Sequence, residues 1–448
     1  LIARADACET NNEFLGPASN TAFMKHIRQV IEGHPLEDRA SNSQSNRIDT
    51  HFSDGSPDYV LPPRQLADSL VDHYWNYVHP LYPFLHKQSF HETYEALWTG
   101  QKFPITTCTV MRTDEVTSVC ILNLVLALGC QYHHEHGAGK ARATAEVFYK
   151  RARSFLRLNP TEPSNNTLQL VQGMLLMTQF LMGTGHTHKA WGVVGMAVRT
   201  CYQLGLHRAA DTGADTFPRP VQREIVRRVY HGALMLERLV CMNLGRPAMV
   251  SVSTLDSVSL PIETDDDDDL QSLQAAQSSK SLLSFFNHSA RLYEIAQEIL
   301  VSLYSGGNQT DSDGLDSYFL RDQSVFRLES YLRKWYAGIP SYLRLDPDAL
   351  NVEGQMLANN SRLPNHRYLQ VRIYLFRPIF VFVCTNSGKQ CSNKHKKLED
   401  DDPTGGLAFR TASQCSFLCV EAAIRLINVM HDNLTSRQAW GRKPSWLY

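Results

Sequence analysis

Apolar residues recur at helical spacing along most of the chain. From Leu66 to Tyr77 they return every three or four residues, which places them on one face of an α-helix. Two prolines then interrupt the pattern, and Ser89 with Glu92 predicts a capping box that opens the next helix. The alternating pattern of a half-buried β-strand is essentially absent. The sequence therefore predicts an all-α fold.

Further helices are predicted wherever the spacing returns. They cover 116–130, 141–158, 168–182, 189–204, 223–244, 282–304, 324–338, 365–382 and 410–433. Thr167 is the candidate N-cap of the helix that begins at residue 168, because its hydroxyl can accept from the first free backbone N–H groups.

Two of these helices carry the clearest end signals. The helix over 189–204 has Trp191 on its apolar stripe, and Gly205 follows where a left-handed C-cap belongs. The helix over 223–244 ends in the same way at Gly245, with a proline shortly beyond. At about 1.5 Å per residue the second helix runs about 33 Å, so we expect it in the middle of the fold.

Composition changes suggest how the chain is organised. We predict an N-terminal segment and linker over residues 1–63, then one large all-helical domain over 64–448. Polar loop insertions are expected near 263–280 and 385–406. The chain begins with Leu1 rather than methionine, so we expect an excerpt or a processed protein.

Charge and cysteine content narrow the function. Lys plus Arg is 44 and Asp plus Glu is 45, so the net charge is −1 and shows no basic excess for phosphate binding. The 10 cysteines include no Cys-x-x-Cys pair, which disfavours a zinc knuckle in these residues. No uninterrupted apolar run reaches the roughly 18 residues that a membrane span needs, and we expect no membrane partner.

Some clusters contain the residue types that form metal or redox sites. Candidates are His133, His134, His136, His186 and His188 for a metal, the run Asp265–Asp269 for magnesium, and Cys415 with Cys419 for redox sensing. No His-Glu-x-x-His, P-loop or nucleophile elbow accompanies them. We therefore favour no catalytic, cofactor-binding or metal residues, and interpret the cysteines as packing residues.

Several segments together carry a family resemblance. In chain order these are EFLGPAS, HYWNYVHPLYPFLHKQSF, LNLVLALGCQY, AWGVVGMAVRTCYQLGLHR, RRVYHGALMLERLVCMNLGRPAMVSVSTLDSVSLP and RYLQVRIYLFRP. The ordered set resembles the fungal-specific transcription factor domain, the middle homology region of zinc-cluster transcription factors. The resemblance covers most of residues 14–448, and its central third is the most specific.

The resemblance singles out a set of motif residues. They are Trp191, Arg199, Gly205, His207, Arg208, Glu237, Arg238, Gly245, Arg246 and Pro247. We interpret them as structural, because the glycines stop helices and the arginines can bond free helix-end carbonyls. We also expect Arg199, Arg208 and Arg246 to pair with acids such as Glu224 or Glu237.

The resemblance implies a nuclear regulator of RNA polymerase II transcription. Its family binds two zinc ions in a six-cysteine cluster that reads DNA, usually as a dimer. This sequence has no such cluster, so zinc and DNA contact are expected only in a missing N-terminal region. The implied partners are the transcription machinery or co-regulators, a small-molecule effector and a second copy of the chain.

Two other functions stay open from the sequence. One is an all-α enzyme with a metal or acid/base site, and the other is an interaction scaffold without DNA binding. A convergent set of acids or ligands would favour the enzyme. The residues upstream of Leu1 would separate a transcription factor from a scaffold.

Overall fold

The computed structural model describes most of the predicted helical chain. It covers residues 14–32, 61–99, 113–132, 138–156, 167–209, 220–250, 258–262, 282–304, 324–343, 355–392 and 407–435. Every regular element in these residues is a helix, which confirms the all-α prediction. The helices are α2 (Asn20–Glu32), α3 (Arg64–His73), α4 (Lys87–Thr99), α5 (Thr113–Cys130), α6 (Ala138–Phe155), α7 (Leu168–Gly183), α8 (Thr187–Gln203), α9 (Leu206–Ala209), α10 (Pro220–Leu244), α11 (Leu282–Tyr304), α13 (Ser324–Gly338), α14 (Gln355–Ser392) and α15 (Leu407–Thr435).

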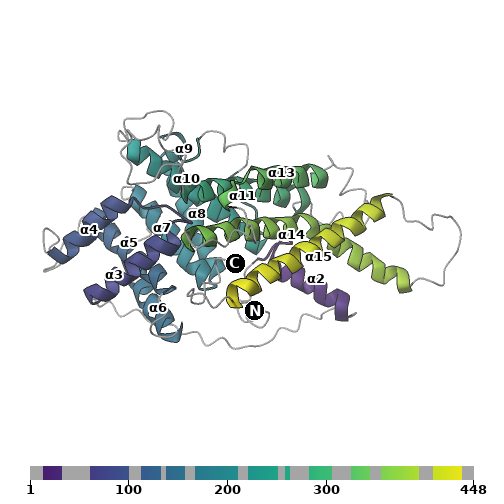
Figure 1. Ribbon diagram of the computed structural model, residues 1–448, viewed down its shortest axis with the longest axis horizontal. Coiled ribbons are helices and arrows are strands. Elements are labelled where there is room, and N and C mark those ends of the chain that lie inside the picture. Colours follow the sequence, from purple (N-terminus) through teal and green to yellow (C-terminus); the bar gives the residue numbers. More distant parts are fainter. Residues whose placement is uncertain are drawn as a thin grey trace.

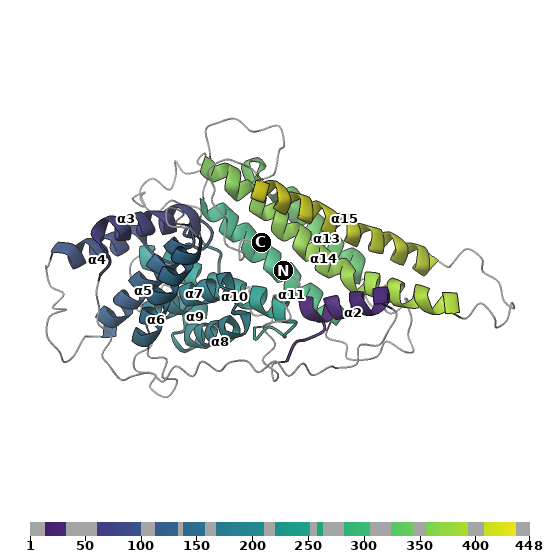
Figure 2. The ribbon, with the colours of Figure 1, turned by 90° about the horizontal axis from the view of Figure 1, so that it is seen from below.

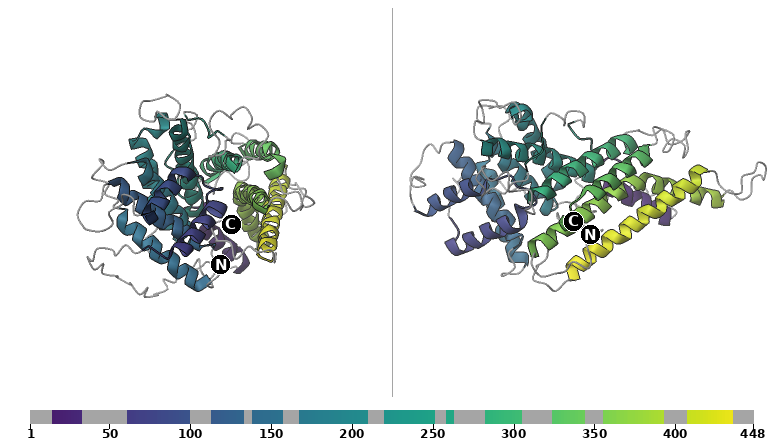
Figure 3. Two further views of the ribbon diagram at one scale, coloured as in Figure 1. Left: turned by 60° about the vertical axis from the view of Figure 1, so that its left-hand side comes forward. Right: turned by 45° about the horizontal axis from the view of Figure 1, so that its top comes forward.

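The helices form two groups that meet along α10. Helices α3 to α8 gather at one end of the molecule (Figure 2). Helices α11, α13, α14 and α15 run side by side at the other, with α15 on the outside (Figures 1 and 3). Helix α10 contacts α7, α8 and α9 in the first group and α11 in the second. The long helix is therefore central, as its length and apolar content predicted.

Helices α8 and α10 are followed by the glycines that the sequence predicts as C-caps. Gly205 and Gly245 both adopt φ of +67°, a left-handed conformation that favours glycine. After Gly245 the Arg246 N–H returns to the Cys241 carbonyl at 2.9 Å, which closes the helix end. At the start of α7 the Thr167 hydroxyl accepts from Leu170 N–H at 3.1 Å, so this predicted N-cap is confirmed.

The predicted start of α4 is wrong by three residues, most of a helical turn. Helix α4 begins at Lys87, so Ser89 lies inside it and does not cap it. The ring of His86 contacts both the N–H and the hydroxyl of Ser89, at 3.3 and 2.8 Å. Glu92 accepts from Gln88 at 3.1 Å and does not close a capping box. His86 therefore occupies the N-cap position that the sequence predicted for Ser89.

Helix α14 is longer than its pattern predicts. It runs through Pro364 and Pro378 to Ser392, so the first part of the predicted loop 385–406 is helical. A proline inside a helix removes one N–H and frees the carbonyl four residues earlier. For Pro378 that carbonyl belongs to Tyr374, and it accepts the Tyr304 hydroxyl at 2.8 Å. The neighbouring helix thus supplies the missing donor. The other predicted loop, 263–280, lies outside the described residues.

Two described stretches are long and apolar enough to cross a membrane, by length and composition alone. They are Pro364–Thr385 and Ala408–His431. Both stretches carry charged side chains, so neither is an uninterrupted apolar run, and the criterion applied to the sequence was stricter than length and mean hydropathy. The first stretch carries Arg377, which is buried at 3% exposure inside the protein. The second leaves apolar side chains of α15 exposed, among them Phe417 at 63% and Ile427 at 62%.

The N-terminal part of the chain is not separate from the helical body. Residues 14–19, which we call the leading segment, continue into α2, and α2 packs against α14. The domain boundary at residue 63 stays a prediction, and residues 33–60 of the predicted linker lie outside the described residues.

Close packing on α10 gives the first testable prediction. A Cβ added to Gly232 would lie 2.1 Å from the Phe84 ring, which is completely buried and has no room to move. We expect Gly232→Ala to lower the free energy of unfolding in urea by about 1–3 kcal/mol. Gly192→Ala on α8 is the matched control, because nothing lies within 4 Å of its added Cβ. That variant should be neutral or up to about 1 kcal/mol more stable. Equal effects of the two substitutions would contradict this packing.

Candidate functional site

The Gly-Arg-Pro…Leu-Pro segment lies along α10 as a strap. We define the strap as residues 247–262, of which 247–250 and 258–262 are described. Glu237 accepts from the Met249 N–H at 2.8 Å. At the other end, His231 Nε2 donates to the carbonyls of Val258 and Ser259 at 3.2 and 3.1 Å. Polar side chains of one helix therefore satisfy the strap backbone at both ends.

Helix α11 holds the strap from the other side. Gln297 accepts from Arg238 Nε at 2.6 Å and donates to the Val250 carbonyl at 2.6 Å. Asn287 donates to the Pro261 carbonyl at 2.8 Å. The described residues of the strap thus bond to both α10 and α11.

Burial controls the charges in this region. Glu237 and Arg238 are 1% and 3% exposed. Burial raises the pKa of the Glu237 carboxyl and lowers the pKa of the Arg238 guanidinium, because a low-dielectric interior disfavours both charges. Glu237 Oε2 is buried without a hydrogen-bond partner, which favours the protonated acid further. Glu224 lies near the far end of the strap and accepts from the Ile262 N–H at 2.9 Å.

The leading segment packs against the C-terminal end of α10, and we call this meeting point the corner. Gly16 N–H donates to the Leu244 carbonyl at 2.9 Å. A Cβ on Gly16 would lie 1.7 Å from the Gly245 carbonyl oxygen, so only two glycines allow these backbones to meet. Arg246 then donates from Nε to the Phe14 carbonyl at 3.0 Å, and its guanidinium lies 4.4 Å from the Trp191 ring centroid. The corner therefore joins EFLGPAS to two later signatures.

Helix α14 anchors the same segment from the opposite side. Arg377 donates to the Ala18 carbonyl and lies among the rings of Phe23, Tyr304 and Tyr374. The Tyr374 hydroxyl contacts both Asn20 Oδ1 at 3.0 Å and the Met242 carbonyl at 3.3 Å. The leading segment is thus bonded to α10 and to α14 together.

The turn over residues 79–85, sequence HPLYPFL, is the second meeting point of the two groups. The Tyr82 hydroxyl accepts from Arg367 of α14 at 2.8 Å. The Arg367 guanidinium also lies 4.9 Å from the Phe285 ring, which belongs to α11. On the other side, Gln172 of α7 donates to the Phe84 carbonyl at 2.6 Å. One turn therefore touches α7, α11 and α14.

The structure brings some predicted motif residues together and separates others. Trp191 and Arg246 stack at the corner, and Gly245 shapes it. Cys241 contacts Pro247 through its carbonyl at 3.5 Å and Glu237 at 3.3 Å. His207 lies apart from this group, with its ring 4.8 Å from Tyr202. Arg199 and Arg208 are exposed on the surface of the α8–α9 region.

In the described residues Glu224 and Glu237 bond partners other than Arg246. Glu224 pairs with Arg227 and Arg228 of its own helix at 3.4 and 3.7 Å. Glu237 accepts a strap N–H, and Arg246 bonds the leading segment. Both acids accept a strap N–H, from Met249 and from Ile262.

The metal and redox candidates do not assemble into a site in the described residues. No group of three or more His, Cys, Asp or Glu side chains there could hold a metal. His186 contacts Thr184 at 3.0 Å and His188 contacts Arg246 at 3.2 Å, so each has its own local partner. His133, His134, His136 and Asp265–Asp269 lie outside the described residues.

Cys415 and Cys419 lie on the inner face of α15. They are 5% and 4% exposed, and burial raises the pKa of both thiols to about 11. A thiol that stays protonated is a poor nucleophile, so the packing interpretation of these cysteines is the better one.

Comparison with known proteins agrees with this arrangement. Residues 71–337, more than half of the chain, match the fungal specific transcription factor domain. The chain belongs to this family. It is 25% identical over 397 residues to the sorbicillinoid biosynthetic cluster transcription factor 2 of Penicillium rubens, covering 86% of this chain and 52% of that protein.

Other relatives have a similar sequence identity to this chain. The sorbicillinoid biosynthetic cluster transcription factor sor3 of Hypocrea jecorina is 24% identical over 388 residues, 86% of this chain and 51% of its own length. The thiamine repressible genes regulatory protein thi1 of Schizosaccharomyces pombe is 23% identical, over 95% of this chain and 49% of its own. This chain thus spans about half the length of these curated relatives. No solved structure matches it.

The structure shows which contacts the family motifs make. The Gly-Arg-Pro…Leu-Pro signature is the strap, and the His-Pro-x-x-Pro signature is the turn that receives Arg367. Sequence reasoning missed the residues that hold them, Gln172, Asn287, Gln297, Arg367 and Arg377. Their only signal was a polar side chain inside an otherwise apolar helix, as with Gln172 in LQLVQGMLLMTQF.

Glu237 gives a prediction with a defined pH dependence. Because its pKa is raised in the folded state, the folded protein binds this proton more tightly than the unfolded chain does. Its contribution to stability is therefore largest below the unfolded pKa and is lost as pH rises toward the folded pKa. We expect Glu237→Gln to gain stability relative to the parent as pH rises above about 4 in urea unfolding, where the carboxyl of the unfolded chain loses its proton.

Glu237→Ala is the companion to that measurement. It removes the acceptor of the Met249 N–H, so it should lose about 1–3 kcal/mol across the whole pH range. If Glu237→Gln shows no change relative to the parent with pH, a buried titrating carboxyl at this position is excluded.

Arg246 gives a prediction about the leading segment. We expect Arg246→Ala to lower the melting temperature and to speed hydrogen exchange at the Gly16 N–H, because the bond to Phe14 and the stack on Trp191 are lost. Arg199→Ala removes an exposed arginine of α8 and serves as the control, with little effect on either quantity. Unchanged exchange at Gly16 in Arg246→Ala would contradict a role in holding this segment.

Proposed function

We propose that this chain is the regulatory region of a fungal zinc-cluster transcription factor that acts in the nucleus on RNA polymerase II transcription. DNA is read by a zinc cluster outside these residues, which is the only place where we expect zinc. The chain itself acts by binding and packing changes and performs no chemistry. Membership of the family and relatives described as transcription factors and regulatory proteins support this proposal.

The observation that carries the proposal is the docking of the leading segment. This segment comes from the N-terminal side and is bonded to the end of α10 and to α14. A regulatory region must connect its internal packing to other parts of the protein. In this chain the connection runs through backbone hydrogen bonds that exist only while α10 and α14 keep their relative positions.

The proposed mechanism is a shift between two arrangements of the helix groups. The strap and the 79–85 turn each tie the two groups together with a small number of buried polar contacts. An effector or partner that favours one arrangement changes the population of the docked leading segment by its difference in affinity. The partners we propose are the transcription machinery or co-regulators, a small-molecule effector and a second copy of the chain.

A reporter experiment tests the proposal. The 448-residue chain is fused behind a bacterial DNA-binding domain and expressed in yeast with a reporter gene under the matching operator. We expect the fusion to change reporter transcription severalfold relative to the DNA-binding domain alone. Arg377→Ala should shift that level further, because it releases the Ala18 carbonyl.

Arg199→Ala is again the control and should behave as the parent. Immunoblots establish equal protein levels. A fusion that leaves the reporter at the level of the DNA-binding domain alone would refute a regulatory role for these residues.

A further inference from the structure

A pocket of about 150 Å³ lies between α4, α5 and α7, next to the 79–85 turn. Its walls are mainly apolar and include Leu85, Phe90, Leu97, Ile121 and Leu122. Ser89 and Gln169 at its margin are exposed to solvent, so the pocket is reached from outside. An apolar cavity of this volume is large enough for a single aromatic ring.

One buried polar side chain faces this pocket. Gln172 lines it and is only 7% exposed. Its Nε2 is occupied, because it donates to the Phe84 carbonyl at 2.6 Å. Its Oε1 accepts no hydrogen bond from the described residues, although a buried amide oxygen gains from a donor. The pocket therefore offers the Gln172 amide oxygen as an acceptor, in a wall that also carries His86, Ser89, Thr93, Ser118 and Gln169.

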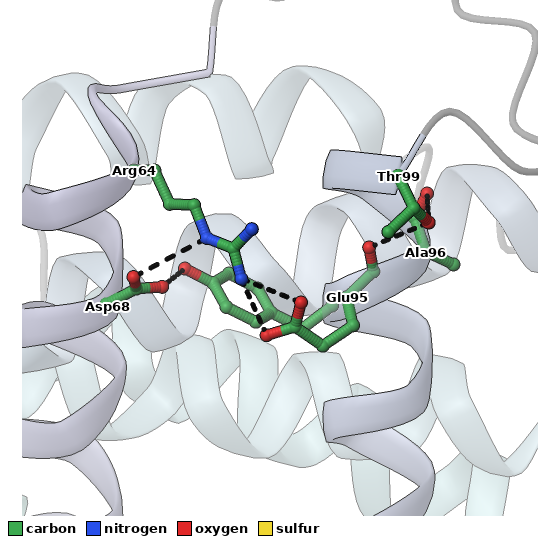
Figure 4. Close-up of polar contacts among 6 residues, drawn as sticks. Arg64, Asp68, Glu95, Ala96 and Thr99 are labelled. Carbon is green, nitrogen blue, oxygen red and sulfur yellow. Dashed lines mark hydrogen bonds and ion pairs between the residues drawn. The ribbon is translucent and has the colours of Figure 1, made fainter.

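No Lys, Arg, Asp or Glu lines the pocket, and its one imidazole, His86, contacts the N–H and the hydroxyl of Ser89 at 3.3 and 2.8 Å. The charged groups nearby are paired with one another, as Figure 4 shows for Arg64, Asp68 and Glu95. Arg64 contacts both carboxylate oxygens of Glu95 at 3.0 and 2.7 Å.

Tyr94 connects this ion-pair group to the pocket. Its ring lines the pocket, while its hydroxyl donates to Asp68 at 2.5 Å. Burial and the Asp68 carboxylate raise the pKa of Tyr94 well above its ordinary value, so the phenol stays neutral. An ionic ligand would lose its hydration in this pocket and find no counter-charge in the wall. The pocket thus selects neutral molecules.

The pocket is mechanically connected to the central helix. Gln172 holds the Phe84 carbonyl, and the Phe84 ring occupies the space left by the missing side chain of Gly232 on α10. Two residues before it, Tyr82 receives Arg367 from α14. Gln172 thus lines the pocket and also holds the 79–85 turn. A ligand that hydrogen-bonds to the Gln172 side chain acts on the same amide that bonds the Phe84 carbonyl.

We propose that this pocket binds a small neutral molecule, about the size of one ring, that carries one hydroxyl or amino donor for Gln172. Occupancy changes the contact of Phe84 with α10. The pocket is then the effector site of the proposed function, on which this role rests, and its binding step is tested independently of transcription.

Three probes of similar size separate the contributions to binding. Benzyl alcohol has a ring and a donor, toluene has the ring alone, and benzoate has a charge. In calorimetric titrations of the 448-residue chain, benzyl alcohol should bind about fivefold more tightly than toluene, as one neutral hydrogen bond allows. Benzoate should not bind at the same concentrations. Binding of benzoate as strong as that of benzyl alcohol, or no binding of any probe, overturns the proposal.

Two variants establish where the probes bind. Gln172→Met keeps the size of the side chain and removes the acceptor, so benzyl alcohol and toluene should bind equally. Leu97→Trp fills the pocket and leaves Gln172 in place, so both affinities should fall more than about tenfold. Val147→Trp at an exposed position of α6 is the control and should bind as the parent. Unaltered binding to Leu97→Trp would place the ligand elsewhere.

Hydrogen exchange tests the connection to α10. Benzyl alcohol should change exchange rates at the amides around Gly232, and this change should be absent in Leu97→Trp. A response limited to α4, α5 and α7 would refute transmission through Phe84. If benzyl alcohol binds and alters α10 but leaves the reporter unchanged, the binding site stands and the regulatory function fails.

Discussion

The structure depends on the burial of α10 on nearly every side. From Val226 to Met242 most of its side chains are inaccessible, including Arg228, His231, Glu237 and Arg238. A polar group in such a position costs about 1–3 kcal/mol if it finds no partner. The strap supplies many of those partners from its backbone, so it completes the interior of the protein. Because the helix and its strap depend on one another, the Gly-Arg-Pro…Leu-Pro signature forms one unit with α10.

Two arginines of α14 are surrounded by aromatic rings, and they bond the 79–85 turn and the leading segment. Arg367 and Arg377 are 6% and 3% exposed, and each lies close to three rings while it donates to an oxygen. A guanidinium suits such sites because it is weakly hydrated and its planar face stacks on aromatic rings. These contacts involve no carboxylate, so salt should weaken them less than it weakens surface ion pairs.

The sequence predicted the helices and their glycine ends well, because apolar spacing and left-handed caps are local properties. It failed where a residue depends on a distant partner. Pro378 lies inside α14, where the Tyr304 hydroxyl bonds the carbonyl that the proline leaves free, and no local pattern contains that information. In the same way, Glu237 serves a strap N–H and not an arginine. The corner of Gly16 and Gly245 joins positions that are far apart in the chain, so both glycines could be noticed in the sequence but their contact could not.

One turn of the chain fixes the orientation of the segment after it. Residues 74–78 form a π-helical turn, in which the His79 N–H reaches back to the Tyr74 carbonyl at 2.9 Å. Such a turn contains one residue more than an α-helical turn and rotates the next residues by about 100° around the helix axis. Tyr82 and Phe84 therefore face their partners only if this extra residue is kept. At this place the number of residues constrains evolution as strongly as their identity, and a single-residue deletion would be more harmful than most substitutions.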